Sequence, residues 1–234
     1  MSSIYLFRHG QAGSRDDYDR LSELGARQAQ LLGCHLATQG MKFAAFFTGE
    51  LRRQRETAAA IIAAGAPLPE PIADPHWNEF DLDAVYNGIA PQLAADDPEF
   101  RSHYEAMEAA ARDASSAVHR QWTMSDIAVV RSWVEGRYTY PGESWRDFTE
   151  RVRGAFETLR EFGPGEAVAI STSATPIAVW MGLALDLEPR NILRSAGSLY
   201  NSSVTSFRIK AEEVTLFSFN QIAHLADPAL RTFR

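Results

Sequence analysis

Ile4-Tyr5-Leu6-Phe7-Arg8-His9-Gly10 decides the fold, because an unbroken apolar run ends abruptly in charged and polar residues. Such a run is typical of a strand buried on both faces, as in a parallel sheet. Apolar residues then recur at helical spacing over about residues 23–39, with Ser22 as a plausible N-cap. A second apolar run at 43–47 precedes an Ala- and Arg-rich helical segment at 51–64. The order strand, helix, strand, helix predicts a parallel α/β sheet.

The rest of the chain leaves this sheet and returns to it. Residues 66–94 are interpreted as irregular because prolines are frequent there. Further elements are expected as helices over about 97–121, 126–136, 144–159 and 176–186, a strand at 167–170 and a hairpin over 204–219. We therefore expect one domain over residues 1–234, a three-layer α/β/α sandwich with a mostly parallel central sheet. A helical cap inserted at about 94–140 is expected over the crevice at the carboxyl ends of the strands.

Composition excludes several protein classes. Of the 234 residues, 45% are hydrophobic and 23% are charged, which excludes a disordered chain, a collagen-like fibre and a coiled coil. A net charge of −7 disfavours nucleic-acid binding. No apolar stretch approaches the ~20 residues of a membrane span, and no signal peptide is recognised, so we expect no membrane association. The single cysteine, Cys34, is expected to be buried and unreactive, and its isolation favours a cytoplasmic location.

Polar side chains follow three of the expected strands at the edge where open α/β sheets bind ligands. Arg8 and His9 follow the first strand, Arg53 lies in the Arg-rich start of the next helix, and residues 171–173 follow a later strand. Arginine presents a rigid fork of donors that matches phosphate oxygens. A neutral histidine is nucleophilic, and nearby guanidinium groups disfavour the imidazolium. These residue types are suited to the transfer of a phosphoryl group to histidine.

Each of these signals has a plainer interpretation when it is taken alone. An Arg-His-Gly tripeptide should occur by chance in roughly one or two chains per hundred. An Arg-rich helix is more often a solvated surface. Their joint occurrence at strand ends favours the functional interpretation. The other histidines, His224 included, are expected to be structural, and none pairs with Cys34 or an acidic cluster at metal-ligand spacing, so no metal and no cofactor are expected.

The sequence resembles the histidine phosphatase superfamily, in its phosphoglycerate-mutase-like branch. The matching segments cover nearly the whole chain in the family's order: Arg8-His9-Gly10, LSELGARQAQ (21–30), TGELRRQRETA (48–58), HWNEFD (76–81), GESWRDFTERV (142–152) and FNQIAHL (219–225). The resemblance implies that His9 attacks phosphorus and becomes a phosphohistidine, while Arg8 and Arg53 hold the phosphoryl oxygens. It also implies that Glu79 protonates the leaving oxygen and later takes a proton from water. The implied activity is a metal-independent phosphatase for a small phosphorylated metabolite, releasing inorganic phosphate.

One departure from the family pattern bears on catalysis. Members usually carry a second histidine in a Ser-His-Gly-Gly segment, and the alignment places Ser173 there, or Thr172 if it shifts by one residue. Serine can still donate a hydrogen bond to phosphate, so Ser173 is a candidate phosphate ligand. Losing a charge-assisted bond costs about 2–4 kcal/mol, or ~10²–10³ in rate. Phosphoglycerate-mutase-type transfer, or a degenerate member that binds a phospho-ligand or a protein without turnover, remain the alternatives. The oligomeric state is not readable, and a homodimer stays open.

Overall fold

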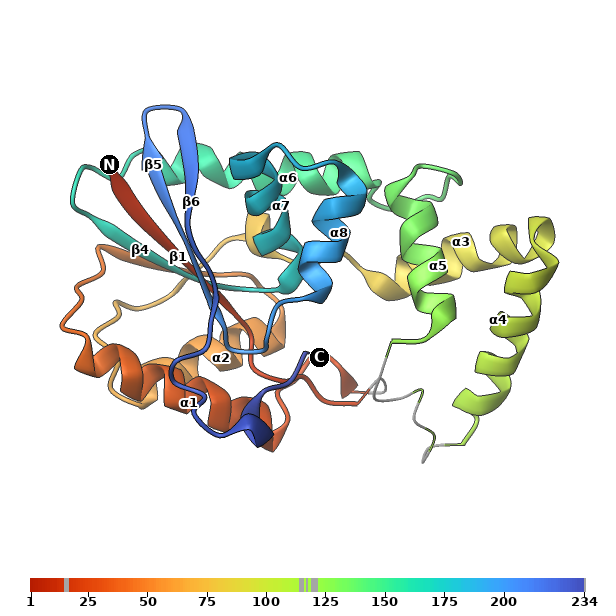
Figure 1. The fold of residues 1–234 in the computed structure, drawn as a ribbon, viewed down its shortest axis with the longest axis horizontal. Coiled ribbons are helices and arrows are strands. Elements are labelled where there is room, and N and C mark those ends of the chain that lie inside the picture. Colours follow the sequence, from red (N-terminus) through yellow and green to blue (C-terminus); the bar gives the residue numbers. More distant parts are fainter. Residues whose placement is uncertain (15–16, 114–115, 117, 119–121, 234) are drawn as a thin grey trace. The chain divides into compact units, whose positions relative to one another are not determined.

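The computed structural model describes residues 1–14, 17–113, 116, 118 and 122–233 (Figure 1). The chain divides into two compact units. The first, the sheet unit, comprises Met1–Gly13, Tyr18–Glu79 and Arg151–Arg234. The second, the helical unit, comprises Ser14–Asp17 and Phe80–Glu150. All five candidate site residues belong to the sheet unit.

A six-stranded sheet forms the centre of the sheet unit, in the order β3-β2-β4-β1-β5-β6. The strands are β1 (Ser2–Arg8), β2 (Ala45–Thr48), β3 (Ile72–Ala73), β4 (Ala167–Thr172), β5 (Val204–Lys210) and β6 (Glu213–Gln221). The pairings β3-β2, β2-β4 and β4-β1 are parallel, whereas β1-β5 and the β5-β6 hairpin are antiparallel. The expected mostly parallel central sheet is therefore confirmed.

The strand register aligns the ends of the three central strands. Arg8 at the end of β1 lies opposite Thr172 of β4, and Thr48 at the end of β2 lies opposite Ser171 of β4. The backbone N–H of His9 continues this ladder by donating to Thr172 O over 2.8 Å. The segments that leave β1, β2 and β4 consequently emerge at one edge of the sheet.

One face of the sheet is covered by α1 (Glu23–Thr38) and α2 (Arg52–Ala63) (Figure 1). The N-cap of α1 is Ser22, as expected, and its side chain accepts a hydrogen bond from Gly25 N. A side chain at Gly33 would place its Cβ 2.3 Å from Ile61 O, so glycine is what allows α1 and α2 to approach this closely. The shared apolar core consists of Phe7, Ala29, Leu32, Leu36, Phe43, Phe46, Ala58, Ile61, Ala66 and Ala169.

The opposite face of the sheet is covered by α7 (Ala174–Leu185) and the part of α6 (Trp145–Leu159) that follows Glu150. Trp180 of α7 is fully buried, with ring-centre distances of 5.9 Å to Phe207 of β5 and 6.4 Å to Phe156 of α6. With helices on both faces, the expected three-layer α/β/α arrangement is confirmed. The helix α8 (Pro189–Gly197) and the 3₁₀ turns η2 (Pro75–Trp77) and η4 (Pro228–Leu230) complete this unit, and were not expected.

The helical unit contains α3 (Leu82–Asp96), α4 (Pro98–Ala111), α5 (Met124–Val134) and the first turns of α6. Buried aromatic side chains form its core, with ring-centre distances of 4.7 Å for Phe80–Trp133 and 5.7 Å for Trp145–Phe148. None of the helices described in either unit is both long and apolar enough for a membrane span.

Two expectations for this region differ from the structure. The segment 66–94 was expected to be irregular, yet α3 occupies its second half with Pro91 inside the helix. Val85, Ile89 and Leu93 are buried at helical spacing, so packing outweighs the cost of the proline. The helix expected over 97–121 ends at Ala111, and its positions 114–115, 117 and 119–121 lie outside the described residues.

Cys34 was also expected to be buried, and it is exposed. The buried stripe of α1 runs through Gly25, Ala29, Leu32 and Leu36 among others, and position 34 lies off that stripe. Helical periodicity therefore decides its exposure in spite of the usual preference of cysteine for the interior.

Candidate active site

His9 follows β1 directly and is only 2% exposed. Its Nδ1 lies 2.7 Å from Gly10 O. A carbonyl oxygen can only accept, so Nδ1 carries the ring proton and the lone pair of the neutral imidazole is on Nε2. Burial, and then the positive charges of Arg53 and Arg8, lower the pKa of His9 well below its ordinary value. At neutral pH the ring is therefore uncharged, with a nucleophilic nitrogen at Nε2.

Arg8 and Arg53 are buried guanidinium groups that act electrostatically on His9. The Nη atoms of Arg8 donate to two backbone carbonyls, Leu199 O and Phe233 O, the latter over 2.7 Å. Arg53 donates from Nη1 to Asp19 Oδ1 over 2.9 Å. The Nε–H groups of both arginines are buried and have no hydrogen-bond partner among the described residues. Such groups are rare because a buried donor without an acceptor is costly, and here both belong to residues whose charges act on His9.

The backbone around Gly10 explains why the first motif ends in glycine. A Cβ at Gly10 would lie 2.2 Å from Gly25 O, a backbone atom that cannot move aside cheaply. Gly10 N donates to Thr57 Oγ1 over 3.1 Å, and that hydroxyl donates in turn to Arg53 O over 2.7 Å. Thr57 thus ties the segment that carries His9 to the first turn of α2 that carries Arg53.

Glu79 lies beside the N-terminus of α7, where Thr175 N donates to Glu79 Oε2 over 3.1 Å. Unpaired N–H groups and the helix dipole favour a carboxylate at this position. The segment before Glu79 is held by Arg151, whose Nη1 donates to Pro75 O over 2.7 Å and to Asn78 O over 3.2 Å. Burial lowers the pKa of Arg8, and the charge of Glu79 partly opposes this shift, so Glu79 lies within electrostatic reach of that guanidinium.

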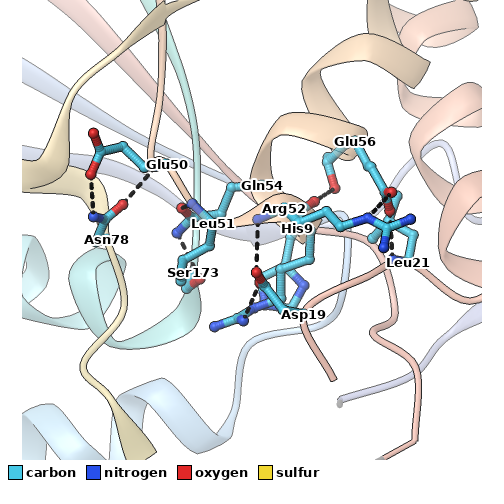
Figure 2. A network of polar contacts seen from close by, with 12 residues as sticks. His9, Asp19, Leu21, Glu50, Leu51, Arg52, Gln54, Glu56, Asn78 and Ser173 are labelled. Carbon is cyan, nitrogen blue, oxygen red and sulfur yellow. Dashed lines mark hydrogen bonds and ion pairs between the residues drawn. The ribbon is translucent and has the colours of Figure 1, made fainter. Parts of the chain in front are cut away.

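Ser173 is the N-cap residue of α7 and is 1% exposed, but its side chain does not cap the helix. Its Oγ instead accepts a hydrogen bond from Gln54 Nε2 over 2.9 Å (Figure 2). The backbone N–H of His9 donates to Thr172 O. Ser173, the residue after Thr172, therefore lies beside His9 where β1 and β4 end. The structure thus brings Arg8, His9, Arg53, Ser173 and Glu79 to one edge of the sheet.

Gln54 was missed by sequence reasoning, as were Asp19 and Phe233. Gln54 occupies the third position of α2, where a glutamine side chain often reaches back to the N–H at the helix start. That position is the one signal that marks it. Asp19 and Phe233 contact the arginines from segments far away in the chain, and no local pattern marks either residue.

His224 lies outside this group of residues. Its Nε2 is 3.2 Å from Ser202 Oγ, and its ring centre is 6.1 Å from that of His35. Burial and the nearby His35 lower the pKa of His224 to about 4. None of its contacts within the described part of the chain is with the His9 ring. No three His, Cys, Asp or Glu side chains gather as a potential metal site in the described ranges.

Comparisons with known proteins show which family the chain belongs to. The sequence matches the profile of the histidine phosphatase superfamily (branch 1) over residues 4–127 and 123–222. It is 40% identical over 60 residues to the mitochondrial serine/threonine-protein phosphatase Pgam5 of Caenorhabditis briggsae. That match spans 26% of this chain and 21% of the relative, so it covers only about a fifth of that protein's length.

Solved structures of similar fold cover nearly the whole chain. YhfR of Bacillus stearothermophilus is 21% identical with a TM-score of 0.67, over 96% of this chain and 100% of that one. Mycobacterial glucosyl-3-phosphoglycerate phosphatase, solved with inorganic phosphate, is 20% identical with a TM-score of 0.62, over 96% and 99% of the two chains. Phosphoglycerate mutase of Bacillus anthracis is 16% identical with a TM-score of 0.62, over 96% and 95%. Since the family profile accounts for nearly the whole sheet unit and its site, the chain belongs to the histidine phosphatase superfamily, branch 1.

Proposed function

We propose that this protein is a metal-independent phosphatase that hydrolyses a small phosphorylated metabolite through a phosphohistidine on His9. The proposal depends on one observation. His9 is buried and neutral, and it lies within the electrostatic influence of two arginines whose Nε–H groups lack acceptors among the described residues. A phosphoryl group supplies those acceptors and is the electrophile that a histidine nitrogen attacks. A site that only bound phosphate would need the arginines but not an uncharged imidazole.

The first half of the reaction forms the phosphohistidine. The lone pair of His9 Nε2 attacks phosphorus, an N–P bond forms, and the P–O bond to the leaving alcohol breaks. Arg8 and Arg53 offset the negative charge on the non-bridging oxygens as the transition state forms. Glu79, in its protonated form, gives its proton to the leaving oxygen. The Nδ1–H bond to Gly10 O keeps the ring in the tautomer that this attack requires.

The second half releases inorganic phosphate. Glu79, now a carboxylate, takes a proton from water while the water oxygen attacks phosphorus. The N–P bond breaks and its electron pair returns to His9 Nε2, so the enzyme regains its starting state. Ser173 donates its hydroxyl proton to a phosphoryl oxygen in both halves. Because serine is shorter than the histidine usual in the family and carries no charge, turnover is expected to be slower than in relatives that keep it.

The names of two structural neighbours support a phosphorylated small molecule as the ligand class, whereas the curated relative is named as a serine/threonine-protein phosphatase. One structural neighbour is named as a glucosyl-3-phosphoglycerate phosphatase and was solved with inorganic phosphate, and another is named as an alpha-ribazole phosphatase from Shigella flexneri. Both names describe phosphoric monoesters of small polar molecules. We infer the same ligand class for this chain, without choosing among its members.

The test is hydrolysis of an aryl phosphate between pH 5 and 8 in the presence of EDTA, for the natural protein and for His9→Ala. We expect activity that resists EDTA and that falls to background in the variant. A quench in acid and a quench in base, after mixing with phosphorus-labelled substrate, should show label that is acid-labile and base-stable on the natural protein alone. Equal hydrolysis by both proteins contradicts the proposal. Arg55→Gln, an exposed change on α2, serves as the control for a nonspecific effect.

A further inference from the structure

We propose that Gln54 is a positioning residue that turns the hydroxyl proton of Ser173 toward the phosphoryl oxygens. This inference rests on the proposed phosphate site and assigns to Gln54 a part in it. Gln54 is fully buried, and its side-chain amide is bonded on both sides. Leu51 N donates to its Oε1 over 3.3 Å, while its Nε2 lies 2.9 Å from Trp77 O and 2.9 Å from Ser173 Oγ.

The chemistry of these partners dictates which way the amide faces. Trp77 O is a carbonyl oxygen and can only accept, and Leu51 N–H can only donate. The amide nitrogen of Gln54 must therefore face Trp77 O, and the oxygen must face Leu51 N. The nitrogen has two protons, so the second goes to Ser173 Oγ (Figure 2). Ser173 is consequently an acceptor toward Gln54, and its own proton has to go elsewhere.

The proton of Ser173 has no acceptor among the described residues. The side chain of Ser173 does not cap α7. In the described part of the chain, its hydroxyl takes part in one hydrogen bond, which it accepts from Gln54. Ser173 is 1% exposed, and its hydroxyl proton has no acceptor among the described residues. In this respect it resembles the Nε–H groups of Arg8 and Arg53. All three are buried donors at the same edge of the sheet, and the proposal assigns one phosphoryl group as their common acceptor.

The surrounding contacts keep Gln54 in this position. Ser171 Oγ donates to Gln54 O over 2.9 Å, which ties the first turn of α2 to the end of β4. A Cβ at Gly49 would lie 2.0 Å from Gln54 Oε1, so glycine there leaves room for the amide. Trp77 O also receives a bond from Thr172 Oγ1 over 2.7 Å, so it keeps a donor if Gln54 is replaced. Loss of the Gln54 amide therefore removes a partner from Ser173 and Leu51, whereas Trp77 O keeps the donor of Thr172.

A double-mutant cycle tests the inference, with Gln54→Met and Ser173→Ala made singly and together. Methionine matches glutamine in length and cannot donate. We expect Gln54→Met to weaken inorganic phosphate binding and kcat/KM by about tenfold in the natural background. In the Ser173→Ala background we expect it to change both by less than about twofold, because the hydroxyl through which it acts is gone. Thermal unfolding of all four proteins verifies that each is folded at the assay temperature.

Gln28→Met is the matched control. Gln28 is equally buried and also bonds through both ends of its amide, to Gln11 N and to Leu230 O, but it does not contact Ser173. Its effect should add to that of Ser173→Ala within about twofold. Gln54→Glu is run in parallel as the isosteric change, because a carboxyl group there accepts from Ser173 and reverses its hydroxyl. It too should weaken phosphate binding in the natural background, and a smaller loss should remain in Ser173→Ala because the added carboxylate also repels the phosphate dianion.

The outcomes separate this inference from the proposed function. If the effects of Gln54→Met and Ser173→Ala are additive, Gln54 is merely structural and the inference is overturned, whatever the protein hydrolyses. Failure of the proposed function shows instead as hydrolysis that survives His9→Ala. Titration with inorganic phosphate measures the coupling energy between Gln54 and Ser173 even if the protein has no turnover. The test of Gln54 and the test of the proposed function can therefore fail independently.

Discussion

Asp19 and Arg53 form an ion pair in which Asp19 Oδ1 lies 2.9 Å from Arg53 Nη1. The other carboxylate oxygen of Asp19 accepts from Arg52 N over 3.1 Å, at the start of α2. The two partners differ in exposure, since 8% of the Arg53 side chain is accessible against 52% of the Asp19 side chain. The guanidinium is therefore fixed, whereas the carboxylate that neutralises it lies at the surface. Asp19 therefore occupies an N–H donor of Arg53 for which a phosphate dianion would compete.

Asp19→Asn should tighten the binding of inorganic phosphate. The change removes the competing charge and keeps an oxygen that can accept from Arg52 N. Exposed ion pairs are worth at most about 1 kcal/mol, so we expect a twofold to roughly fivefold lower Kd by titration calorimetry. Glu157→Gln removes the same charge from α6, where Glu157 forms an exposed pair with Arg160 just beyond the helix, and should leave the Kd unchanged. Weaker binding in Asp19→Asn would mean that Asp19 orients Arg53 instead of competing with its ligand.

Arg53→Gln should alter both the rate and its pH dependence. Loss of one donor that stabilises transition-state charge is expected to lower kcat/KM by about 10²–10³. After burial, the charge of Arg53 is the largest influence that lowers the pKa of His9, so its removal raises that pKa. The acidic limb of the kcat/KM profile, where His9 takes a proton and loses its nucleophilic lone pair, should then move to higher pH.

Arg55→Gln is the matched change for this prediction. It removes the same charge from the same helix, but Arg55 is exposed and Arg53 is buried. Its profile should overlay that of the natural protein, with kcat/KM within about twofold. An acidic limb that stays in place in Arg53→Gln would show that another group, and not His9, sets it.

Strong local patterns account for the parts of this fold that the sequence predicts. β1, α1, α2 and β4 each combine a buried run or a helical stripe with a turn or cap at the end, and the parallel sheet follows from their order. Arg8 ends β1, His9 follows it and Arg53 lies in the first turn of α2, so their convergence could be expected from the strand ends. The helix α3 was not predicted because Pro91 and the prolines before it suggest an irregular segment. They outweigh the helical spacing of apolar residues such as Val85 and Ile89.

Long-range contacts explain what the sequence does not predict about the site. Asp19 reaches Arg53 across 34 positions, Gln54 reaches Ser173 across 119, and Phe233 O reaches Arg8 across 225. Partners at such separations are set by the packing of whole elements, which no local period records. Pattern reasoning thus finds the residues that carry the charge of the site and misses those that orient them.

Gly10→Ala should destabilise the protein and disturb the site together. Its Cβ would lie 2.2 Å from Gly25 O, and relief requires movement of the backbone that carries His9. Overpacking of this kind costs about 1–3 kcal/mol, which corresponds to about 2–4 °C in Tm per kcal/mol for a chain of this size. Gly197→Ala is the control, because nothing lies within 4 Å of the added Cβ there. Calorimetry should show a lower Tm for the first variant and an equal or slightly higher one for the second.

The free energy of unfolding should fall between pH 6.5 and pH 4 in part because of His224. Its pKa is about 4 in the folded protein, lowered by burial and by His35, against about 6.5 in an unfolded chain. In this window the unfolded state binds a proton that the folded state does not, so each step toward acid favours unfolding. Partial exposure reduces the effect, and we expect a loss of about 2 kcal/mol across the window.

His224→Gln isolates this contribution, because glutamine can still donate to Ser202 Oγ but does not titrate. Urea unfolding at pH 7, 6, 5 and 4 should give a shallower decline for the variant than for the natural protein. His9, whose pKa is also lowered, titrates in both proteins and cancels in the comparison. His35→Gln should lie between the two, since removing a neighbouring charge lets the pKa of His224 rise. Parallel curves for the natural protein and His224→Gln would show that His224 takes up its proton equally in the folded and unfolded states.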